Sequence, residues 1–265
     1  MARYVRFIHD GVPRYGRVED TEVAVIDPHP FARHQPTGER VPVAGLTLLA
    51  PVIPSKVVCV GRNYRDHAEE MGEELPKEPL LFLKPSSSVI GPGEAIRLPS
   101  DQSSHVDHEA EVAVVIGALL QRVTPDEART GIFGVTAAND VTARDLQKRE
   151  SQWFRAKGFD SFCPLGPAIA TDVEFADLAV RCRVDGEVRQ ESSTRALIFD
   201  IPTLVSTISE VMTLLPGDVI LTGTPAGVGP LTAGQRVAVE VDGVGVLENP
   251  VVDRGAPASR VNGSG

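Results

Sequence analysis

A short apolar run in the middle of the chain, residues 106–116, places two glutamates at the start of a buried strand. The residues after Glu109 are mostly β-branched or small and apolar and lack helical spacing, which is typical of a strand inside a sheet. Side chains alternate between the two faces of a strand, so Glu109 and Glu111 share one face. That face continues into the core through Ala113 and Val115. The sequence therefore predicts a sheet with two carboxylates at the end of an apolar face.

Two carboxylates this close cannot both stay ionised there unless a proton or a cation compensates their charge. A bound hard metal ion would do so. The alternative is a strand end whose acids reach solvent, and the run alone does not decide between the two. His105 and His108 flank the pair, so a zinc site is conceivable, but the oxygen ligands of Glu109 and Glu111 suit Mg, Mn or Ca better.

Charge and hydropathy narrow the class of partner. The 265 residues carry a formal net charge of -10 without a basic cluster, and binding to a nucleic acid backbone needs concentrated Lys and Arg. No apolar stretch approaches the roughly 20 residues that span a bilayer, and the N-terminus lacks a signal-peptide apolar region. We therefore expect no nucleic acid partner, no membrane partner and a cytoplasmic location.

Turn-forming residues are frequent, with 24 Gly and 21 Pro, and they favour a β-rich α+β fold over a helical bundle. Residues 1–50 are predicted to form a small N-terminal subdomain of hairpins, with a polar loop at residues 28–40. After a Pro-containing linker, a second and larger domain is predicted at residues 55–252. Residues 253–265 are small and polar and are predicted to form a flexible tail.

A possible acid–base pair lies on a short helix that is predicted to follow the strand at residues 56–60. His67 and Glu70 are spaced i, i+3, so they share one face of this helix. A carboxylate beside an imidazole raises its basicity and fixes its tautomer, as a general base requires. The alternative is a solvated surface pair, which is the commoner outcome for this spacing alone. The polar residues 72–79 that follow suggest a lid that orders over substrate.

Two further charged residues lie at the ends of predicted strands. Asp140 follows the strand at residues 134–138 and is the natural third carboxylate, because strand ends that converge on a pocket carry site residues. Taken alone, an Asp in this position is usually a turn or cap residue. Lys84 ends the apolar run at residues 80–83 and either reaches a ligand or merely closes the strand, and the second interpretation is favoured.

Several motifs together resemble the fumarylacetoacetate hydrolase family, in the branch of acylpyruvate hydrolases, oxaloacetate decarboxylases and 2-hydroxyhepta-2,4-diene-1,7-dioate isomerases. They occur in the family's order and cover about residues 55 to 250. The matching pieces are Gly61-Arg-Asn-Tyr64, His67 with Glu70, Phe82-Leu-Lys-Pro85, His108-Glu-Ala-Glu111, Asn139-Asp-Val-Thr-Ala-Arg-Asp145, Lys157 and Ile220-Leu-Thr-Gly-Thr-Pro-Ala-Gly-Val-Gly229.

The resemblance implies a mixed β-roll, a homodimer and a role for each matching residue. Glu109, Glu111 and Asp140 fall on metal ligands that usually hold Mg²⁺ or Mn²⁺. His67 and Glu70 fall on a dyad that activates water or moves a proton, and Lys157 falls on a lysine that stabilises enolate charge. The positions that line the substrate pocket are Arg144, Gln147 and Thr224, for which the alternatives are a surface ion pair, a helix-face residue and a turn residue.

The expected chemistry starts when a 2-oxo acid chelates the metal ion, which draws electron density toward C2. The site would then produce an enolate by cleaving a C–C bond or by moving a proton. Hydrolysis of the C–C bond of an acylpyruvate is the favoured expectation. The alternatives on the same site are diene-dioate isomerisation and oxaloacetate decarboxylation, and the alternative from another class is a non-catalytic protein with a structural cation site.

Overall fold

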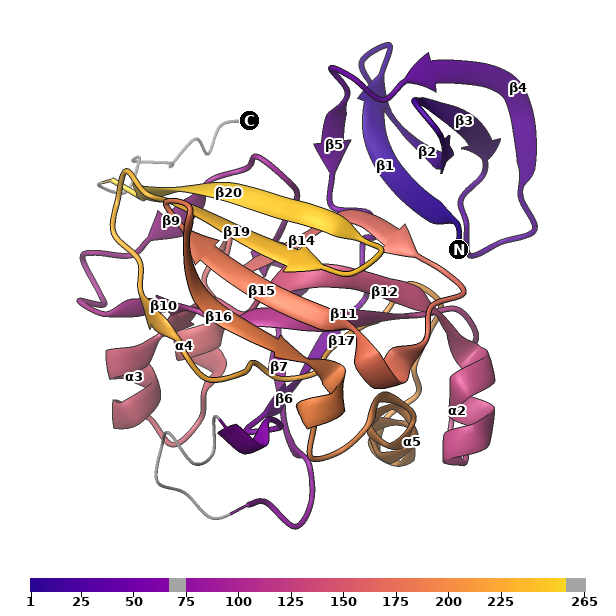
Figure 1. Cartoon of the computed structure of the whole chain (residues 1–265). Coiled ribbons are helices and arrows are strands. Elements are labelled where there is room, and N and C mark those ends of the chain that lie inside the picture. Colours follow the sequence, from indigo (N-terminus) through magenta and orange to yellow (C-terminus); the bar gives the residue numbers. More distant parts are fainter. Residues whose placement is uncertain (67–74, 256–265) are drawn as a thin grey trace, which may run out of the picture.

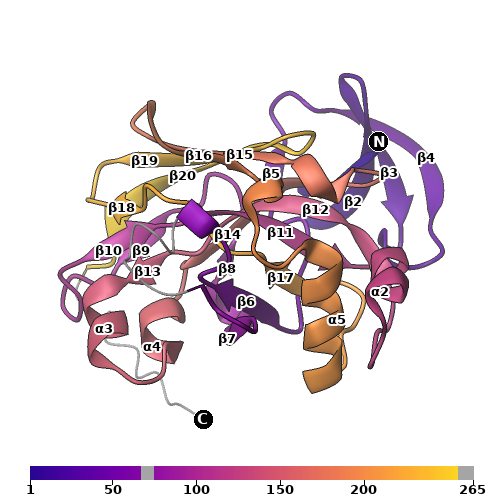
Figure 2. The same ribbon diagram turned by 60° about the horizontal axis from the view of Figure 1, so that its bottom comes forward.

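The structure is a computed structural model of the chain and describes residues 1–66 and 75–255. In these residues the strands form three sheets, and the helices are few and short (Figures 1 and 2). The largest sheet has 12 strands. Its path runs β4 (Gln35–Pro42), β3 (Glu22–Asp27), β2 (Val12–Glu19), β1 (Arg3–His9), β14 (Cys163–Ala170), β12 (Ile132–Asn139), β11 (Ala110–Ile116), β17 (Val219–Leu221), β6 (Val57–Gly61) and β7 (Leu80–Lys84), with β5 (Thr47–Leu49) on β1 and β8 (Val89–Ile90) on β14.

The other two sheets are smaller. One joins β13 (Thr142–Ala143), β10 (Val106–His108) and β18 (Gly229–Pro230), and the other joins β16 (Glu187–Ser193), β15 (Ala179–Val184), β19 (Arg236–Val241), β20 (Gly245–Asp253) and β9 (Ile96–Leu98). The α-helices of the described residues are α2 (Pro125–Gly131), α3 (Arg144–Arg149), α4 (Phe154–Lys157) and α5 (Ile201–Val211), and the 3₁₀ turns are η1 (Ser86–Ser88), η2 (Phe175–Asp177) and η3 (Thr194–Ala196).

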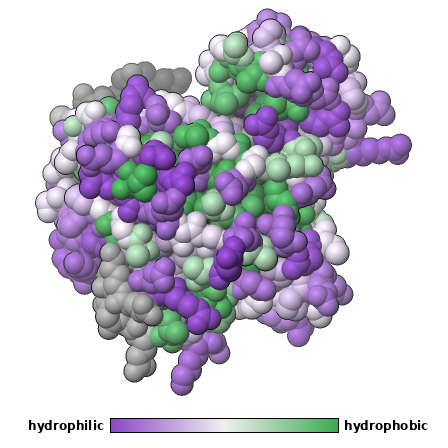
Figure 3. Space-filling view, viewed as in Figure 1, coloured by the Kyte–Doolittle hydropathy of each residue, from purple (hydrophilic) through white to green (hydrophobic). Residues whose placement is uncertain are grey.

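Most neighbouring strands are antiparallel, but three pairs are parallel: β17 with β6, β14 with β8, and β20 with β9. The predicted β-rich α+β class with mixed sheets is therefore confirmed. None of the helices that the structure describes is long and apolar enough to cross a membrane. Hydrophobic and hydrophilic side chains are interspersed over the face drawn in Figure 3.

The N-terminal strands β1 to β5 form the indigo and violet unit at the upper right of Figure 1. Their apolar side chains, including Val5, Phe7 and Val23, pack on one another and on Ala168 of β14. Pairing of β1 with β14 joins this unit to the central sheet. At the other end of the chain, Asp253, the first residue of the predicted tail, is instead the last residue of β20 and pairs with Leu98.

The expectation of a loop throughout residues 28–40 is wrong for its second half. Gln35–Pro42 forms β4, which pairs antiparallel with β3. Nearly all of its side chains are exposed, and β4 is an edge strand of the sheet. Hydrogen bonds to β3 hold this strand in the sheet without burial of its side chains. Its sequence therefore lacks the apolar alternation by which a half-buried strand is recognised.

β11 lies at the centre of the large sheet, between β12 and β17. Its side chains are buried on both faces: Ala113 and Val115 belong to one apolar cluster, whereas Val112 and Val114 belong to another. The five-stranded sheet packs over the second face, with β15 against β11 (Figure 1). A strand covered on both sides holds its first residues firmly, which positions the glutamates predicted at its start.

All three cysteines are buried and free. Burial raises the pKa of Cys163 and of Cys182 to about 12, and it raises that of Cys59 well above its usual value. No cysteine is therefore a thiolate nucleophile at neutral pH.

Candidate active site

Three carboxylates meet where β10, β11 and β12 end or begin. Glu109 lies between β10 and β11, Glu111 is the second residue of β11, and Asp140 directly follows β12. The antiparallel register sets Glu111 opposite Ala138, and the Asp140 backbone N–H donates to the Glu109 carbonyl at 2.8 Å. One oxygen from each carboxylate lies within 4.8 Å of the others. The sequence predicted this grouping, and the residues Glu109, Glu111 and Asp140 are 5%, 2% and 1% exposed respectively.

Two buried lysines compensate part of this negative charge. The Lys157 ammonium, at the end of α4, lies 2.8 Å from Glu109 Oε2 and 2.7 Å from Asp140 Oδ2. The Lys84 ammonium, at the end of β7, lies 2.5 Å from Asp140 Oδ1 and donates to the Val141 carbonyl at 3.1 Å. The favoured interpretation that Lys84 merely closes its strand is therefore wrong. Strand pairing of β7 with β6 brings it beneath Asp140, which the local sequence does not reveal.

Arg144 supplies a third positive charge from the start of α3. Its Nε lies 2.8 Å from Asp107 Oδ2 and its Nη2 lies 2.6 Å from Glu109 Oε1, while Nη1 donates to Gln147 Oε1 at 2.6 Å. The side chain is buried, so the surface ion pair considered for it is excluded. Since Arg144 donates to the Gln147 carbonyl oxygen, the Gln147 amide nitrogen is the atom left to face a ligand.

Glu109 and Glu111 have opposite electrostatic surroundings. Burial alone would raise the pKa of Glu109, but Lys157 and Arg144 outweigh burial and hold that pKa well below its usual value. Burial, Asp140 and Glu109 raise the pKa of Glu111 well above its usual value. Among the described residues, the Gly223 N–H is the donor to Glu111, at 2.6 Å. Within residues 1–66 and 75–255, no ion pair to Glu111 is formed, as expected where a metal ion belongs.

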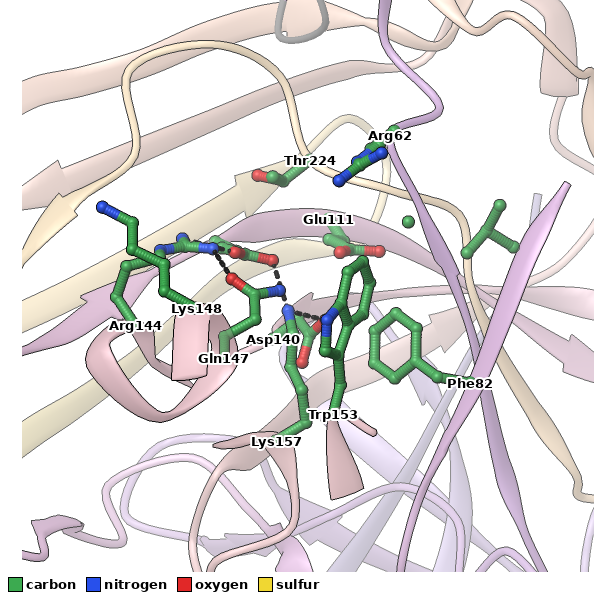
Figure 4. A pocket seen from close by; sticks show the side chains of 13 residues that line it. Arg62, Phe82, Glu111, Asp140, Arg144, Gln147, Lys148, Trp153, Lys157 and Thr224 are labelled. Atoms are coloured by element: carbon green, nitrogen blue, oxygen red, sulfur yellow. Dashed lines mark hydrogen bonds and ion pairs between the residues drawn. The ribbon is translucent and has the colours of Figure 1, made fainter. Parts of the chain in front are cut away.

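The carboxylates form the floor of a cavity of about 290 Å³. The predicted residues Lys157, Arg144, Gln147 and Thr224 all border it (Figure 4). The predicted dyad of His67 and Glu70 lies outside the described residues. The other lining residues are Val60, Gly61, Arg62, Phe82, Lys148 and Trp153. Phe82 and Trp153 stand in or beside the motifs that carried the resemblance, which was the available signal for them.

A buried glutamine that was not predicted from the sequence, Gln190, links several segments beside the cavity by hydrogen bonds. Gln190 Oε1 accepts from the Ala110 N–H at 2.9 Å and lies 3.1 Å from His108 Nδ1. Its Nε2 donates to Thr224 Oγ1 and to the Pro225 carbonyl, both at 2.8 Å. The Thr224 hydroxyl in turn donates to the Ala110 carbonyl at 2.9 Å. Because this proton is engaged, Thr224 can only accept a hydrogen bond from a ligand in this arrangement.

Replacement of Gln190 by Leu is expected to destabilise the protein by about 2–4 kcal/mol, since several buried polar groups lose their partner at once. Urea unfolding measures this change. Gln235→Leu is the control, because Gln235 bonds Thr232 and Asp185 at the surface, and its effect is expected within about 1 kcal/mol. If the two substitutions lowered the free energy of unfolding equally, the hydrogen bonds of Gln190 would contribute no more to stability than those of Gln235.

An aromatic wall closes one side of the cavity. The Phe82 and Trp153 rings meet edge to face with centroids 5.3 Å apart, and the Lys157 ammonium lies 5.0 Å from the Phe82 centroid. A Cβ on Gly61 would lie 2.9 Å from Trp153 Cζ3. Glycine at position 61 therefore lets the indole occupy the cavity wall.

Trp153 is the one tryptophan of the chain, so intrinsic fluorescence reports on the cavity directly. We expect oxalate added in the presence of Mn²⁺ to change the emission saturably, because a ligand would displace water from the indole face and Mn²⁺ quenches nearby fluorophores. A titration followed at the tryptophan emission maximum tests this. The same titration of Trp153→Phe should show no change. If the tryptophan emission did not change at saturating ligand concentration, the ligand would bind away from the wall formed by Phe82 and Trp153.

Comparison with known proteins shows which family this chain belongs to. Residues 56–252 match the family described as fumarylacetoacetate (FAA) hydrolase C-terminal, and residues 2–51 match the one described as Rv2993c-like, N-terminal. The chain belongs to the fumarylacetoacetate hydrolase family. The predicted family resemblance is thus confirmed.

Similar proteins include Protein Rv2993c of Mycobacterium tuberculosis, 49% identical over 91% of this chain and 92% of the relative. The mitochondrial oxaloacetate tautomerase fahd2 of Xenopus laevis is 44% identical over 79% of this chain and 69% of its own. Among solved structures, 2-hydroxyhepta-2,4-diene-1,7-dioate isomerase from Mycobacterium marinum has a TM-score of 0.90 at 44% identity, covering 97% of this chain and 100% of that chain.

Proposed function

We propose that the protein is a divalent-metal-dependent enzyme that converts 2-oxo acids through an enolate, with keto–enol isomerisation as its reaction. The observation that carries the proposal is the buried trio Glu109, Glu111 and Asp140, with the Lys157 ammonium against two of its members at 2.7–2.8 Å. Two relatives at 44% identity are named for a tautomerase and an isomerase, which supports isomerisation, whereas a solved structure at 37% identity is named for a hydrolase.

The trio fits a Mg²⁺ or Mn²⁺ ion. All three side chains offer hard oxygen ligands, they converge in a buried cavity, and Glu111 lacks a cationic partner among the described residues. A cation held there would act as a Lewis acid on the 2-oxo group.

The chain's own residues supply the remaining functions. Although burial would lower the pKa of Lys157, Asp140 and Glu109 raise it, so the side chain stays protonated and can stabilise negative charge on the substrate oxygen. The Gln147 amide N–H₂ donates to a substrate oxygen, and Thr224 accepts from an enol hydroxyl. The indole of Trp153 limits access of water to the bound enolate.

Acylpyruvate hydrolysis, the expectation from sequence, is the second candidate. It requires a base that deprotonates water, and the described residues of the cavity include no uncommitted base. The dyad His67 and Glu70 would serve, and its role remains a prediction. The homodimer that the resemblance implies also remains a prediction, as does decarboxylation of oxaloacetate.

The deciding experiment follows the ultraviolet absorbance of enol-oxaloacetate and of acetylpyruvate, each with Mg²⁺ and then with excess chelator. We expect Mg²⁺-dependent conversion of the oxaloacetate enol to its keto form without carbon–carbon cleavage. Chelator-sensitive release of acetate and pyruvate from acetylpyruvate would instead establish the hydrolase. If the cation site is only structural, neither activity should be seen and oxalate should not compete for the metal ion. The melting temperature should still fall when the metal ion is removed.

A further inference from the structure

The two glutamates of the carboxylate trio stand where the chain passes from one sheet to another. β10 belongs to the three-stranded sheet and β11 to the largest one, so Glu109 lies between two sets of paired strands. Side chains of other segments hold the backbone here. The Glu109 N–H donates to Asn139 Oδ1 at 3.0 Å. The Ala110 N–H donates to Gln190 Oε1 and the Ala110 carbonyl accepts from Thr224, both at 2.9 Å. These bonds fix the backbone that separates the two glutamates.

A β-bulge turns Gln190 toward this backbone. In β16, Gln190 pairs with Cys182. The next pair is Arg183 with Val188, so Arg189 is an extra residue. In a regular strand, residues 188 and 190 would share one face, but Val188 is 46% exposed and Gln190 only 1%. Bulges occur next to active sites, where they redirect a side chain. The bulge thus directs a polar side chain of this hairpin inward.

Gln190 also holds the glycine-rich loop that follows β17. Its Nε2 donates to the Pro225 carbonyl at 2.8 Å. The same loop contains Gly223, whose N–H donates to Glu111 at 2.6 Å. One side chain therefore joins the backbone at Ala110 to the loop that supplies a hydrogen-bond donor to Glu111.

Building on the proposed function, we propose that Gln190 is a positioning residue that fixes Glu109 and Glu111 relative to each other and thereby makes the site prefer Mg²⁺ to Ca²⁺. Gln190 is not among the described residues that line the cavity, so it acts through its hydrogen bonds. Mg²⁺ requires nearly ideal octahedral coordination, whereas Ca²⁺ accepts irregular coordination. Ligands that are held rigidly therefore favour Mg²⁺, and ligands that can move lose this preference.

Metal dissociation constants test this assignment. Electron paramagnetic resonance measures free Mn²⁺, and Mg²⁺ and Ca²⁺ are added as competitors. Gln190→Met removes the hydrogen bonds and keeps a side chain of similar length. It is expected to weaken Mg²⁺ roughly 10- to 100-fold and Ca²⁺ by no more than about threefold. The control is Ser209→Ala, which removes buried hydrogen bonds to Val123 and Ser206. It should lower the melting temperature and leave both constants within about twofold.

Gln190→Glu provides a second variant, because a glutamate oxygen can still accept from the Ala110 N–H. Its added charge acts on both divalent ions alike, so the ratio of the Mg²⁺ and Ca²⁺ constants is the measurement. The preference for Mg²⁺ should persist in this variant.

Equal weakening of the two ions in Gln190→Met, or loss of the preference in Gln190→Glu, overturns the assignment. A wild type that binds Mn²⁺ but does not prefer Mg²⁺ to Ca²⁺ overturns it as well. A wild type that binds none of the three ions would instead refute the proposed function, and the assignment with it.

Discussion

Lys157→Met is expected to lower the free energy of unfolding of the metal-free protein by about 3–5 kcal/mol. The ammonium that lies 2.8 Å from Glu109 and 2.7 Å from Asp140 would be lost, and two buried carboxylates would lose their shared cation. The remaining positive groups, Lys84 and Arg144, each serve only one of them. Urea unfolding in the presence of a chelator measures the loss.

Addition of Mg²⁺ should restore most of this stability, because a divalent ion compensates the same carboxylates. Turnover should nevertheless stay at least about 100-fold below wild type, since the charged donor to the substrate oxygen is absent. Lys56→Met is the matched control: Lys56 pairs with the buried Asp218, away from the cavity, so Mg²⁺ should not rescue it. Unfolding free energies that Mg²⁺ leaves unchanged in Lys157→Met would contradict placement of the ion among these carboxylates.

The central part of the site could be predicted from sequence because local rules determine it. Alternation along a strand sets Glu109 and Glu111 on one side, and an antiparallel neighbour brings its own end, with Asp140, to the same place. The β-rich class followed from short apolar runs separated by Gly and Pro. Neither prediction needed knowledge of which distant segments meet.

Residues that contact the site from distant parts of the chain could not be predicted, because the sequence alone does not show which distant segments meet. Gln190 bonds Ala110 from 80 positions away, and Lys84 reaches Asp140 from 56 positions away. Their local sequences are those of an ordinary hairpin and an ordinary strand end. Arg62 stood inside a motif, but its positive φ and its place on the cavity become visible only with the backbone in place.

Glu111→Gln should raise the melting temperature of the metal-free protein at pH 8, whereas Glu109→Gln should lower it. The pKa of Glu111 is raised by burial and by Asp140 and Glu109, so as the pH rises above 4.5, the usual value, the folded state holds a proton that the unfolded state releases. Stability therefore falls with rising pH until Glu111 ionises, and an uncharged amide removes this loss. The gain should be a few degrees, since 1 kcal/mol corresponds to roughly 2–4 °C in a chain of this size.

Ionisation of Glu109 has the opposite effect on stability, because Lys157 and Arg144 hold its pKa below its usual value. Its ionised form stabilises the fold above pH 4.5, and an amide would leave Lys157 and Arg144 short of a charge partner, at a cost of about 1–3 kcal/mol. Both variants should lose the increase in melting temperature that Mg²⁺ gives the wild type and more than about 100-fold in turnover. Melting curves of the three proteins with chelator and with Mg²⁺ decide the matter. Shifts of the same sign in the chelated variants would mean that the two carboxylates share one electrostatic environment and that Glu111 has no special need of a metal ion.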